Sequence, residues 1–121
     1  MENKEDKNLF RLRHIIVCIK KLEYIAPLLH TYDDFVTKWT AQDIVIRNLE
    51  IIGEAVAHIS DDLKQNYPEI PWKDIKRIRN IVVHEYFGIN LKVIWNTLNN
   101  DIPILKNQIQ TIIDDIEKIN H

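Results

Sequence analysis

Apolar residues recur every three or four positions along almost the whole chain, and this spacing places them on one side of an α-helix. No stretch of useful length alternates apolar and polar residues in the way that a half-buried strand does. Only two glycines and four prolines interrupt the pattern. The hydrophobic pattern therefore predicts an all-α protein.

The first apolar stripe predicts a helix of about 25 residues that ends before Thr31. Its members are Leu9, Leu12, Ile16, Ile19, Leu22, Ala26 and Leu29. Thr31 with Asp34, and Thr40 with Asp43, resemble capping boxes, in which the two side chains bind free backbone N–H groups at the start of a helix. We therefore expect a short turn over residues 32–37 and a second long helix that starts at Thr40.

The second helix carries its own apolar stripe, formed by Val45, Leu49, Ile52, Val56, Ile59 and Leu63. Gly53 lies inside it, where glycine costs roughly 1 kcal/mol relative to alanine. That cost is reasonable where a second backbone must approach closely, so we expect a close helix contact at this position. Residues 66–71 (NYPEIP) end this helix and start the third, because proline is tolerated in a first helical turn.

The third helix is predicted from Trp72 to about Tyr86, where Gly88 stops it. Asn90 can cap a fourth helix, and Pro103 must kink or split that helix. The stripe of the fourth helix comprises Ile94, Leu98, Leu105, Ile109, Ile112, Ile116 and Ile119. Four long helices with short connections favour an up-and-down four-helix bundle. The length of 121 residues fits a single domain over residues 1–121.

Composition narrows the function classes. The 16 lysines and arginines against 18 acidic residues give a net charge of -2, so a nucleic-acid role needs a local basic patch. Cys18 is alone and lies among apolar residues, which indicates a small buried hydrophobe in a reducing compartment. No window approaches the roughly 18 apolar residues of a membrane span. We therefore expect a soluble, cytoplasmic protein.

The third helix does not have the composition of a simple core helix. Projected at about 100° per residue, Arg79 emerges from the middle of the apolar side, with Tyr86 about 20° away. That apolar side comprises Trp72, Ile75, Ile78, Val82 and Val83. The opposite side is a basic band formed by Lys73, Lys76, Arg77, Asn80 and His84. This band is the local patch that a nucleic-acid role requires.

A guanidinium on an apolar face needs a partner, because an unpaired buried charge costs several kcal/mol. One interpretation is a buried ion pair between Arg79 and Glu50 or Glu54 of the second helix. His84 alone is consistent with an ordinary hydrogen-bonded histidine near a helix end. Together, Arg79 and His84 match metal-free RNA cleavage, in which histidine moves a proton and arginine holds the phosphate during attack by the 2′-hydroxyl.

Other residues of the basic band can support this chemistry. Asn80 can donate to the phosphate or orient His84, and Lys76 and Arg77 are candidates for substrate binding. Arg79 and His84 are about 140° apart around a straight helix, so one chain does not easily bring both to one phosphate. We therefore expect a homodimer in which the apolar faces around Arg79 pack across a two-fold axis and form one cleft.

Glu50, Glu54 and His58 along the second helix raise the question of a metal site. Carboxylate-bridged bundles repeat a Glu-x-x-His pair on two helices. Here Glu54 and His58 are four residues apart and there is no second copy. We expect a solvated Glu54–His58 pair, no metal and no cofactor. For Trp72, core packing is favoured over stacking on bases.

The stretch from Arg79 to Tyr86 resembles the R-x4-H-x-Y signature of HepT-like toxins, members of the HEPN superfamily of small helical ribonucleases. The resemblance covers nearly the whole chain, through residues 48–55 (NLEIIGEA), residues 70–74 (IPWKD), and Trp95 with residues 101–103 (DIP). It implies a four-helix domain that forms a homodimer and cuts RNA at a cleft between the two copies, without a metal.

The resemblance also implies residue roles. Arg79 and His84 match the family's catalytic pair, and Asn80 matches the polar residue beside the arginine. Tyr86 matches the tyrosine on which a MntA-type nucleotidyltransferase antitoxin places adenosine monophosphate, an anionic group that would compete with RNA phosphate for the same cations. The implied function is an endoribonuclease toxin of a toxin–antitoxin module. The alternative is a non-catalytic dimeric HEPN protein that binds RNA or the nucleotidyltransferase.

Overall fold

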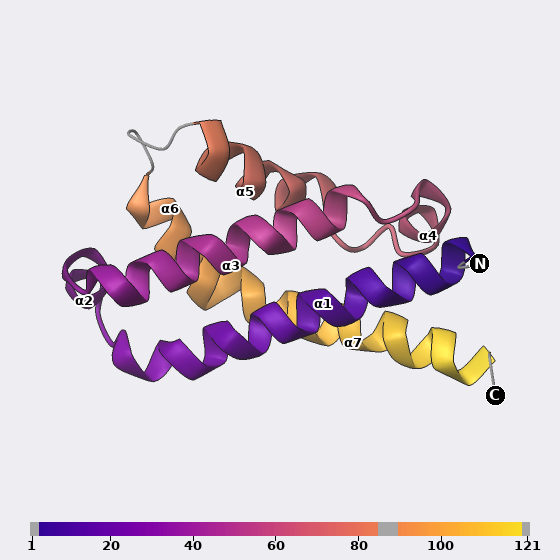
Figure 1. Cartoon of the computed structure of the whole chain (residues 1–121), viewed down its shortest axis with the longest axis horizontal. Helices are drawn as coiled ribbons and strands as arrows, with labels where there is room; N and C mark the ends of the chain where they lie inside the picture. The colour runs from indigo at the N-terminus through magenta and orange to yellow at the C-terminus, as the bar shows by residue number, and fades with distance from the viewer. Residues whose placement is uncertain (1–2, 85–89, 120–121) are drawn as a thin grey trace.

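The computed structural model describes residues 3–84 and 90–119, without the side chains of residues 81–84. Every element in this part is helical, so the all-α class is confirmed. The long helices are α1 (Lys4–Ile25), α3 (Trp39–Ala57), α5 (Trp72–His84) and α7 (Ile102–Ile119), and the shorter ones are α2 (Tyr32–Thr37), α4 (Asp61–Asn66) and α6 (Leu91–Asn96). In Figure 1, α1 and α3 lie side by side, α5 flanks α3, and α7 packs against α1.

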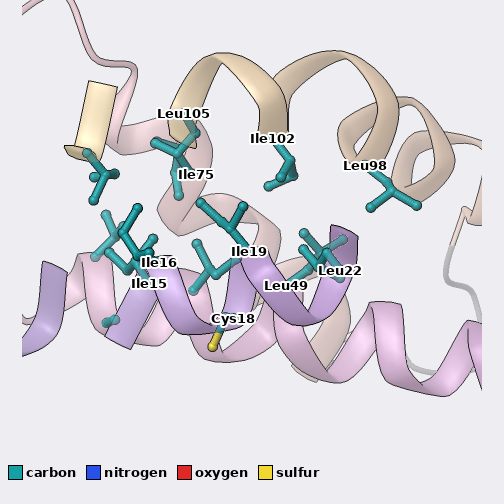
Figure 2. Close-up of a cluster of buried hydrophobic side chains, with 14 of the residues drawn as sticks. Ile15, Ile16, Cys18, Ile19, Leu22, Leu49, Ile75, Leu98, Ile102 and Leu105 are labelled. Atoms are coloured by element: carbon teal, nitrogen blue, oxygen red, sulfur yellow. The ribbon is translucent and has the colours of Figure 1, made fainter. Parts of the chain in front are cut away.

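The core is built mainly from isoleucine and leucine side chains of α1, α3 and α7. Figure 2 shows part of it, with Ile19 of α1 facing Ile102 of α7, and with Leu49 of α3 and Ile75 of α5 in the same cluster. Cys18 is buried as expected, and burial raises the pKa of its thiol. Within the described residues, no helix has the length and apolar character needed to cross a membrane.

Residues 32–37 form helix α2 rather than the expected turn. The predicted capping box is present, because Thr31 Oγ1 accepts from Asp34 N and the Asp34 carboxylate accepts from Thr31 N. Asp34 also accepts from His30 N at 3.0 Å, and this hydrogen bond is the main cause of its lowered pKa. A short helix replaces the turn because its first backbone N–H groups are satisfied in this way.

The second expected capping box, at Thr40 and Asp43, does not form. Helix α3 already starts at Trp39, with Lys38 at the cap position and no side-chain cap. Gln42 Nε2 donates instead to the carbonyls of Phe35 and Val36 at the end of α2. The chain therefore passes almost directly from α2 into α3, which leaves Thr40 inside the first turn.

The predicted second helix is divided, because α3 ends at Ala57 and Leu63 belongs to α4. Ser60 caps α4 by accepting from Leu63 N, and it also contacts the buried side chain of Asn8 in α1. Asn8 Nδ2 donates to Ser60 Oγ at 2.8 Å, and Ser60 N donates to Asn8 Oδ1 at 3.0 Å. Serine favours the N-cap position, and the continuous apolar spacing concealed this break.

The predicted division of the last helix near Pro103 is confirmed. Asn90 caps α6 as expected, and the chain then forms a π-helical segment (Thr97–Asp101) before α7 begins at Ile102. Pro103 has no N–H to continue an α-helical ladder, and the N–H of Ile102 reaches the carbonyl of Thr97. Helix α5 begins at Trp72 as predicted, whereas its expected end at Tyr86 and Gly88 lies outside the described residues.

Candidate active site

Gly53 of α3 lies directly against Arg79 of α5. A Cβ atom at position 53 would be 2.6 Å from Arg79 Cβ and 3.2 Å from Arg79 Cα, too close for any side chain. The close helix contact predicted at Gly53 is therefore confirmed. Because glycine allows the two backbones to touch here, the contact sets the level along α3 at which the Arg79 side chain emerges.

Glu54, the residue after Gly53, binds the Arg79 guanidinium through Arg79 Nε and Glu54 Oε2. This decides between the two carboxylates considered for Arg79. The pair is not buried as that interpretation expected, because 35% of the Arg79 side chain and 46% of the Glu54 side chain are exposed. An exposed ion pair contributes at most about 1 kcal/mol, so Glu54 orients Arg79 without preventing a phosphate from binding it.

The exposed part of Arg79 borders an open hollow of about 500 Å³. Helix α1 provides Phe10, Arg11 and His14, and α3 provides Glu50, Ile51, Glu54, Ala55 and His58. The sequence prediction missed the contribution of α1, because nothing in the spacing of its residues shows that α1 lies beside Arg79. The hollow combines two arginines with two histidines, which are groups that bind anions and move protons.

Glu54 also faces His58, as expected from their spacing. His58 Nδ1 lies 3.7 Å from Glu54 Oε1 and 2.9 Å from the backbone oxygen of Glu54. Among the side chains that the structure describes, in residues 3–80 and 90–119, no three from His, Cys, Asp or Glu are arranged to hold a metal ion. Glu54 therefore connects the Arg79 guanidinium with an imidazole on the same hollow.

The described side chains of the basic band are exposed, as their position opposite the apolar side predicted: Lys73, Lys76, Arg77 and Asn80. Arg77 Nη2 lies 3.5 Å from Asp74 Oδ1, and Arg79 Nη1 donates to Asn80 Oδ1 over a long 3.5 Å. Lys76 lies near Lys64 of α4. Burial lowers the pKa of Lys64, and the charge of Lys76 lowers it further although Asp61 acts in the opposite direction. Helix α4 thus adds a cation to the band that the sequence did not indicate.

His84 is the last residue of α5, and its side chain is not among those described. The backbone alone shows that it is five residues beyond Arg79 on the same helix, which corresponds to about 140° of rotation and 7.5 Å of rise. Tyr86, the predicted modification site, and Phe87 lie outside the described residues. The structure therefore places Arg79 in contact with Glu54 and Asn80, and the roles of Arg79, Asn80, His84 and Tyr86 all stay predictions.

Two residues of the apolar side of α5 belong to the core of their own chain. Trp72 and Ile75 are buried there, and Trp72 Nε1 donates to the carbonyl of Tyr67 at 3.0 Å. Core packing of Trp72 is thus confirmed. The side chains of Val82 and Val83, which complete this side, are not among those described. The contact between two copies expected on this side of α5 therefore stays a prediction.

Comparison with known proteins places the chain among relatives of one kind. The family model of HepT-like ribonucleases matches residues 12–112, which include α3, α5 and the basic band. A candidate RNase of Methanocaldococcus jannaschii is 44% identical over 87 residues, which is 72% of each chain. A candidate ribonuclease HepT of Thermococcus cleftensis is 43% identical over 81 residues, or 67% of this chain and 74% of that one.

A third relative, a candidate RNase of Caldanaerobacter subterraneus, is 37% identical over 103 residues, or 84% of this chain and 90% of its own. No solved structure matches the chain. The family match covers more than half of the chain, and the three relatives all have names that describe RNases. The chain that presents Arg79 at the α3–α5 contact therefore belongs to the HepT-like ribonuclease family.

Proposed function

We propose that the protein is a metal-independent endoribonuclease with Arg79 and His84 as its catalytic pair. The observation that carries this proposal is the partly exposed Arg79 side chain, which Gly53 and Glu54 position at the edge of an open hollow. Family membership supports RNA as the substrate.

The reaction uses this chain's own side chains and water. The 2′-oxygen of RNA bonds to phosphorus while the bond from phosphorus to the 5′-oxygen breaks. His84 takes the proton of the 2′-hydroxyl, and a water molecule gives a proton to the leaving 5′-oxygen, which yields a 2′,3′-cyclic phosphate and a 5′-hydroxyl; the protonated His84 then returns its proton to the resulting hydroxide. Arg79 stabilises the negative charge on the phosphate oxygens. Asn80, Lys76 and Arg77 hold the flanking phosphates.

The proposal includes the biological setting that the resemblance implies. The chain is a single HEPN-like unit with an up-and-down four-helix arrangement, acts in the cytoplasm as the toxin of a toxin–antitoxin module, and works as a homodimer. A nucleotidyltransferase antitoxin inhibits it by AMPylation of Tyr86. A bulky anionic nucleotide two residues beyond His84 would compete with RNA for the cations of the site.

Cleavage of RNA in the presence of a chelator tests the enzymatic part. Arg79→Ala should lower kcat/KM at least about 100-fold, the usual effect of removing one group that stabilises transition-state charge, and His84→Ala should do the same. Arg47→Ala and His30→Ala, which alter exposed residues elsewhere, are the matched controls. Equal cleavage by all five proteins, or activity that disappears with the chelator, would refute the proposal.

The second candidate function is that of a non-catalytic dimeric protein that binds RNA or the nucleotidyltransferase. The Glu54–Arg79 ion pair favours it, because the catalytic cation already has a counter-charge. Expression of wild type, Arg79→Ala and His84→Ala in cells separates the two candidates. Growth arrest by the wild type alone supports the enzyme, whereas equal growth and equal RNA profiles support the binding protein.

The regulatory part has its own test. After co-expression with the neighbouring nucleotidyltransferase gene, the intact mass of the wild type should increase by one or more adenosine monophosphate units. Tyr86→Phe should keep its unmodified mass. The same added mass on both proteins would exclude Tyr86 as the modified residue.

A further inference from the structure

A second open hollow lies between α4 and the start of α5. Its volume is about 640 Å³, and it shares no lining residue with the hollow beside Arg79. Three lysines line it, Lys64 from α4 and Lys73 and Lys76 from α5. We call this feature the α4–α5 hollow, defined by these three lysines. It brings together positive charges from two different helices.

The lysines of the α4–α5 hollow are not neutralised by ion pairs of their own. In the described structure, none of the three forms an ion pair or a side-chain hydrogen bond. Asp74 lines the same hollow but lies 3.5 Å from Arg77. Burial lowers the pKa of Lys64, the charge of Asp61 raises it, and the charge of Lys76 lowers it further. An anion between Lys64 and Lys76 would counteract both effects that disfavour the charged ammonium.

The apolar part of the hollow suits a nucleotide better than a bare ion. Pro71 is exposed there, and 8% of Trp72 is accessible. The indole N–H of Trp72 donates to the Tyr67 carbonyl at 3.0 Å, which holds the ring in place. A nucleotide carries its phosphate beside a sugar and a base with apolar faces. It can therefore place the phosphate between the lysines and the sugar or base against Pro71 at the same time.

Lys73, Lys76 and Asn80 form a row along α5 that leads from this hollow to Arg79. At about 100° per residue, the three lie within about 60° of one another around the helix. The seven residues from Lys73 to Asn80 correspond to about 10 Å of rise. Asn80 in turn accepts from Arg79 Nη1. One strand of nucleic acid can therefore contact both the α4–α5 hollow and the candidate active site.

We propose that the α4–α5 hollow is an RNA subsite that binds a backbone phosphate to one side of the phosphate held at Arg79. Lys64 and Lys73 bind this phosphate from two helices, and Lys76 holds the strand between the two sites. Lysine suits this task, because its compact charge binds phosphate without a fixed geometry. The subsite binds substrate and takes no part in bond breaking, so it lowers KM without changing kcat. This inference rests on the proposed function, which supplies RNA as the substrate and Arg79 as the reference point.

Binding of a labelled single-stranded oligoribonucleotide tests the subsite without cleavage. In a His84→Ala background and with a chelator, Lys64→Gln and Lys73→Gln should each raise the dissociation constant about tenfold. Each should also reduce the slope of log affinity against log salt concentration by about 0.7, the value for one phosphate contact on a single strand. Lys20→Gln on α1 is the matched control, because it removes the same charge from an exposed position outside the hollow.

Thermal melts verify that all of these variants fold. Equal dissociation constants for Lys64→Gln and Lys20→Gln would overturn the proposal. A parent protein that binds no RNA would overturn it as well.

The length of the substrate distinguishes a separate subsite from a general effect of charge. On a long oligoribonucleotide, Lys64→Gln should raise KM about tenfold and keep kcat within twofold of the wild type. A dinucleotide has a single phosphate, which Arg79 holds, so the wild type and Lys64→Gln should cleave it with equal kcat/KM. A loss on the dinucleotide as large as the loss on the long substrate would refute a separate subsite.

Two further comparisons identify the anion and separate this proposal from the proposed function. If Lys64→Gln weakens binding of polyglutamate or inorganic phosphate but leaves RNA binding unchanged, the hollow holds another anion and the proposal is wrong. If the wild type binds RNA through Lys64 but cleaves none, the enzyme is refuted and the subsite is supported. If the wild type cleaves RNA and Lys64→Gln binds it equally well, the subsite is refuted and the enzyme is supported.

Discussion

Helix α7 buries six aliphatic side chains in the core, whereas the described side chains of α5 include only Trp72 and Ile75 among the buried residues. Both helices show the apolar spacing of an amphipathic helix. Among the other positions of α5 are the lysines and arginines of the basic band and Arg79. The same periodicity therefore serves stability in α7 and the presentation of charge in α5.

The comparison shows how the position of each helix is controlled. Many interchangeable aliphatic contacts fix α7, so the loss of one contact lowers stability and moves little else. The level of α5 depends on the contact between Gly53 and Arg79 and on the Glu54 ion pair beside it. We therefore expect changes in α7 to affect stability, and changes at the α3–α5 contact to affect catalysis more than stability.

The largest effect on stability should come from Ile109→Ala in α7. Ile109 is completely buried, and the cavity should lower the free energy of unfolding by about 2–5 kcal/mol. Urea denaturation measures this loss. The kcat of RNA cleavage, measured well below the unfolding transition, should stay within twofold of the wild type. A tenfold lower kcat in fully folded protein would contradict the expectation that changes in α7 affect stability and not catalysis.

Gly53→Ala should have a smaller effect on stability and a larger effect on catalysis. The added methyl must push Arg79 and α5 away from α3, which costs about 1–3 kcal/mol and outweighs the roughly 1 kcal/mol that alanine gains in helix propensity. Displacement of a catalytic group by 1 Å can cost up to about 100-fold, and we expect kcat to fall at least tenfold. Ala57→Gly in the same helix, a change of similar energy away from Arg79, should leave kcat unchanged.

Glu54→Gln tests whether the ion pair orients Arg79. Both Glu54 and Glu50 line the hollow, but only Glu54 contacts the guanidinium in the described structure. We expect kcat to fall about tenfold in Glu54→Gln with little change in KM, and Glu50→Gln to keep the kcat of the wild type. Steady-state kinetics on an oligoribonucleotide measure both values. Equal kcat values for the two variants would show that Glu54 does not position Arg79.

The smallest effect concerns Tyr67, which lies just before α5 and donates to Asp115 Oδ2 of α7 at 2.8 Å. Burial is the main cause, and the hydrogen bond to Asp115 the second, of a Tyr67 pKa raised from 10.0 to about 12. The folded state therefore favours the protonated phenol. The protonated phenol therefore contributes to the free energy of unfolding, by an amount on the order of 1 kcal/mol. This stabilisation is complete below pH 10 and is lost as the pH rises toward 12.

Thermal unfolding between pH 9 and 12 measures the contribution of Tyr67, with Tyr67→Phe as the control. The difference in stability between the two proteins should disappear across this range. If the difference in stability stays constant across this range, the pKa of Tyr67 is the same in the folded and unfolded states.

Periodic and local signals in the sequence predicted the helical class, the close contact at Gly53, the capping box at Thr31 and the division of the last helix near Pro103. Each depends on residues that are close in the chain, or on one residue with an unusual backbone requirement. The break before α4 was missed, because the capping preference of Ser60 was hidden by apolar spacing that continues across it. Its hydrogen bonds to Asn8 cross 52 residues of sequence.

The candidate site was predicted where it follows from a single helix, and missed where it depends on packing. Projection of α5 separated Arg79 from the basic band, and the carboxylates of α3 were correctly named as its possible partners. The choice of Glu54 over Glu50 depends on the register of α5 against α3, and the contribution of Phe10, Arg11 and His14 depends on where α1 lies. Neither follows from periodicity, because periodicity does not specify which helices become neighbours.

The π-helical segment Thr97–Asp101 makes the protein sensitive to the exact number of residues at this point. A π-helical turn contains one residue more than an α-helical turn, and Asn99 and Asn100 are exposed within it. Deletion of either would rotate α6 by about 100° relative to α7. The stacking of Trp95 on Phe35 of α2, with ring centroids 5.6 Å apart, would be lost. A single-residue gap here in a relative's sequence would therefore indicate a different direction of α6.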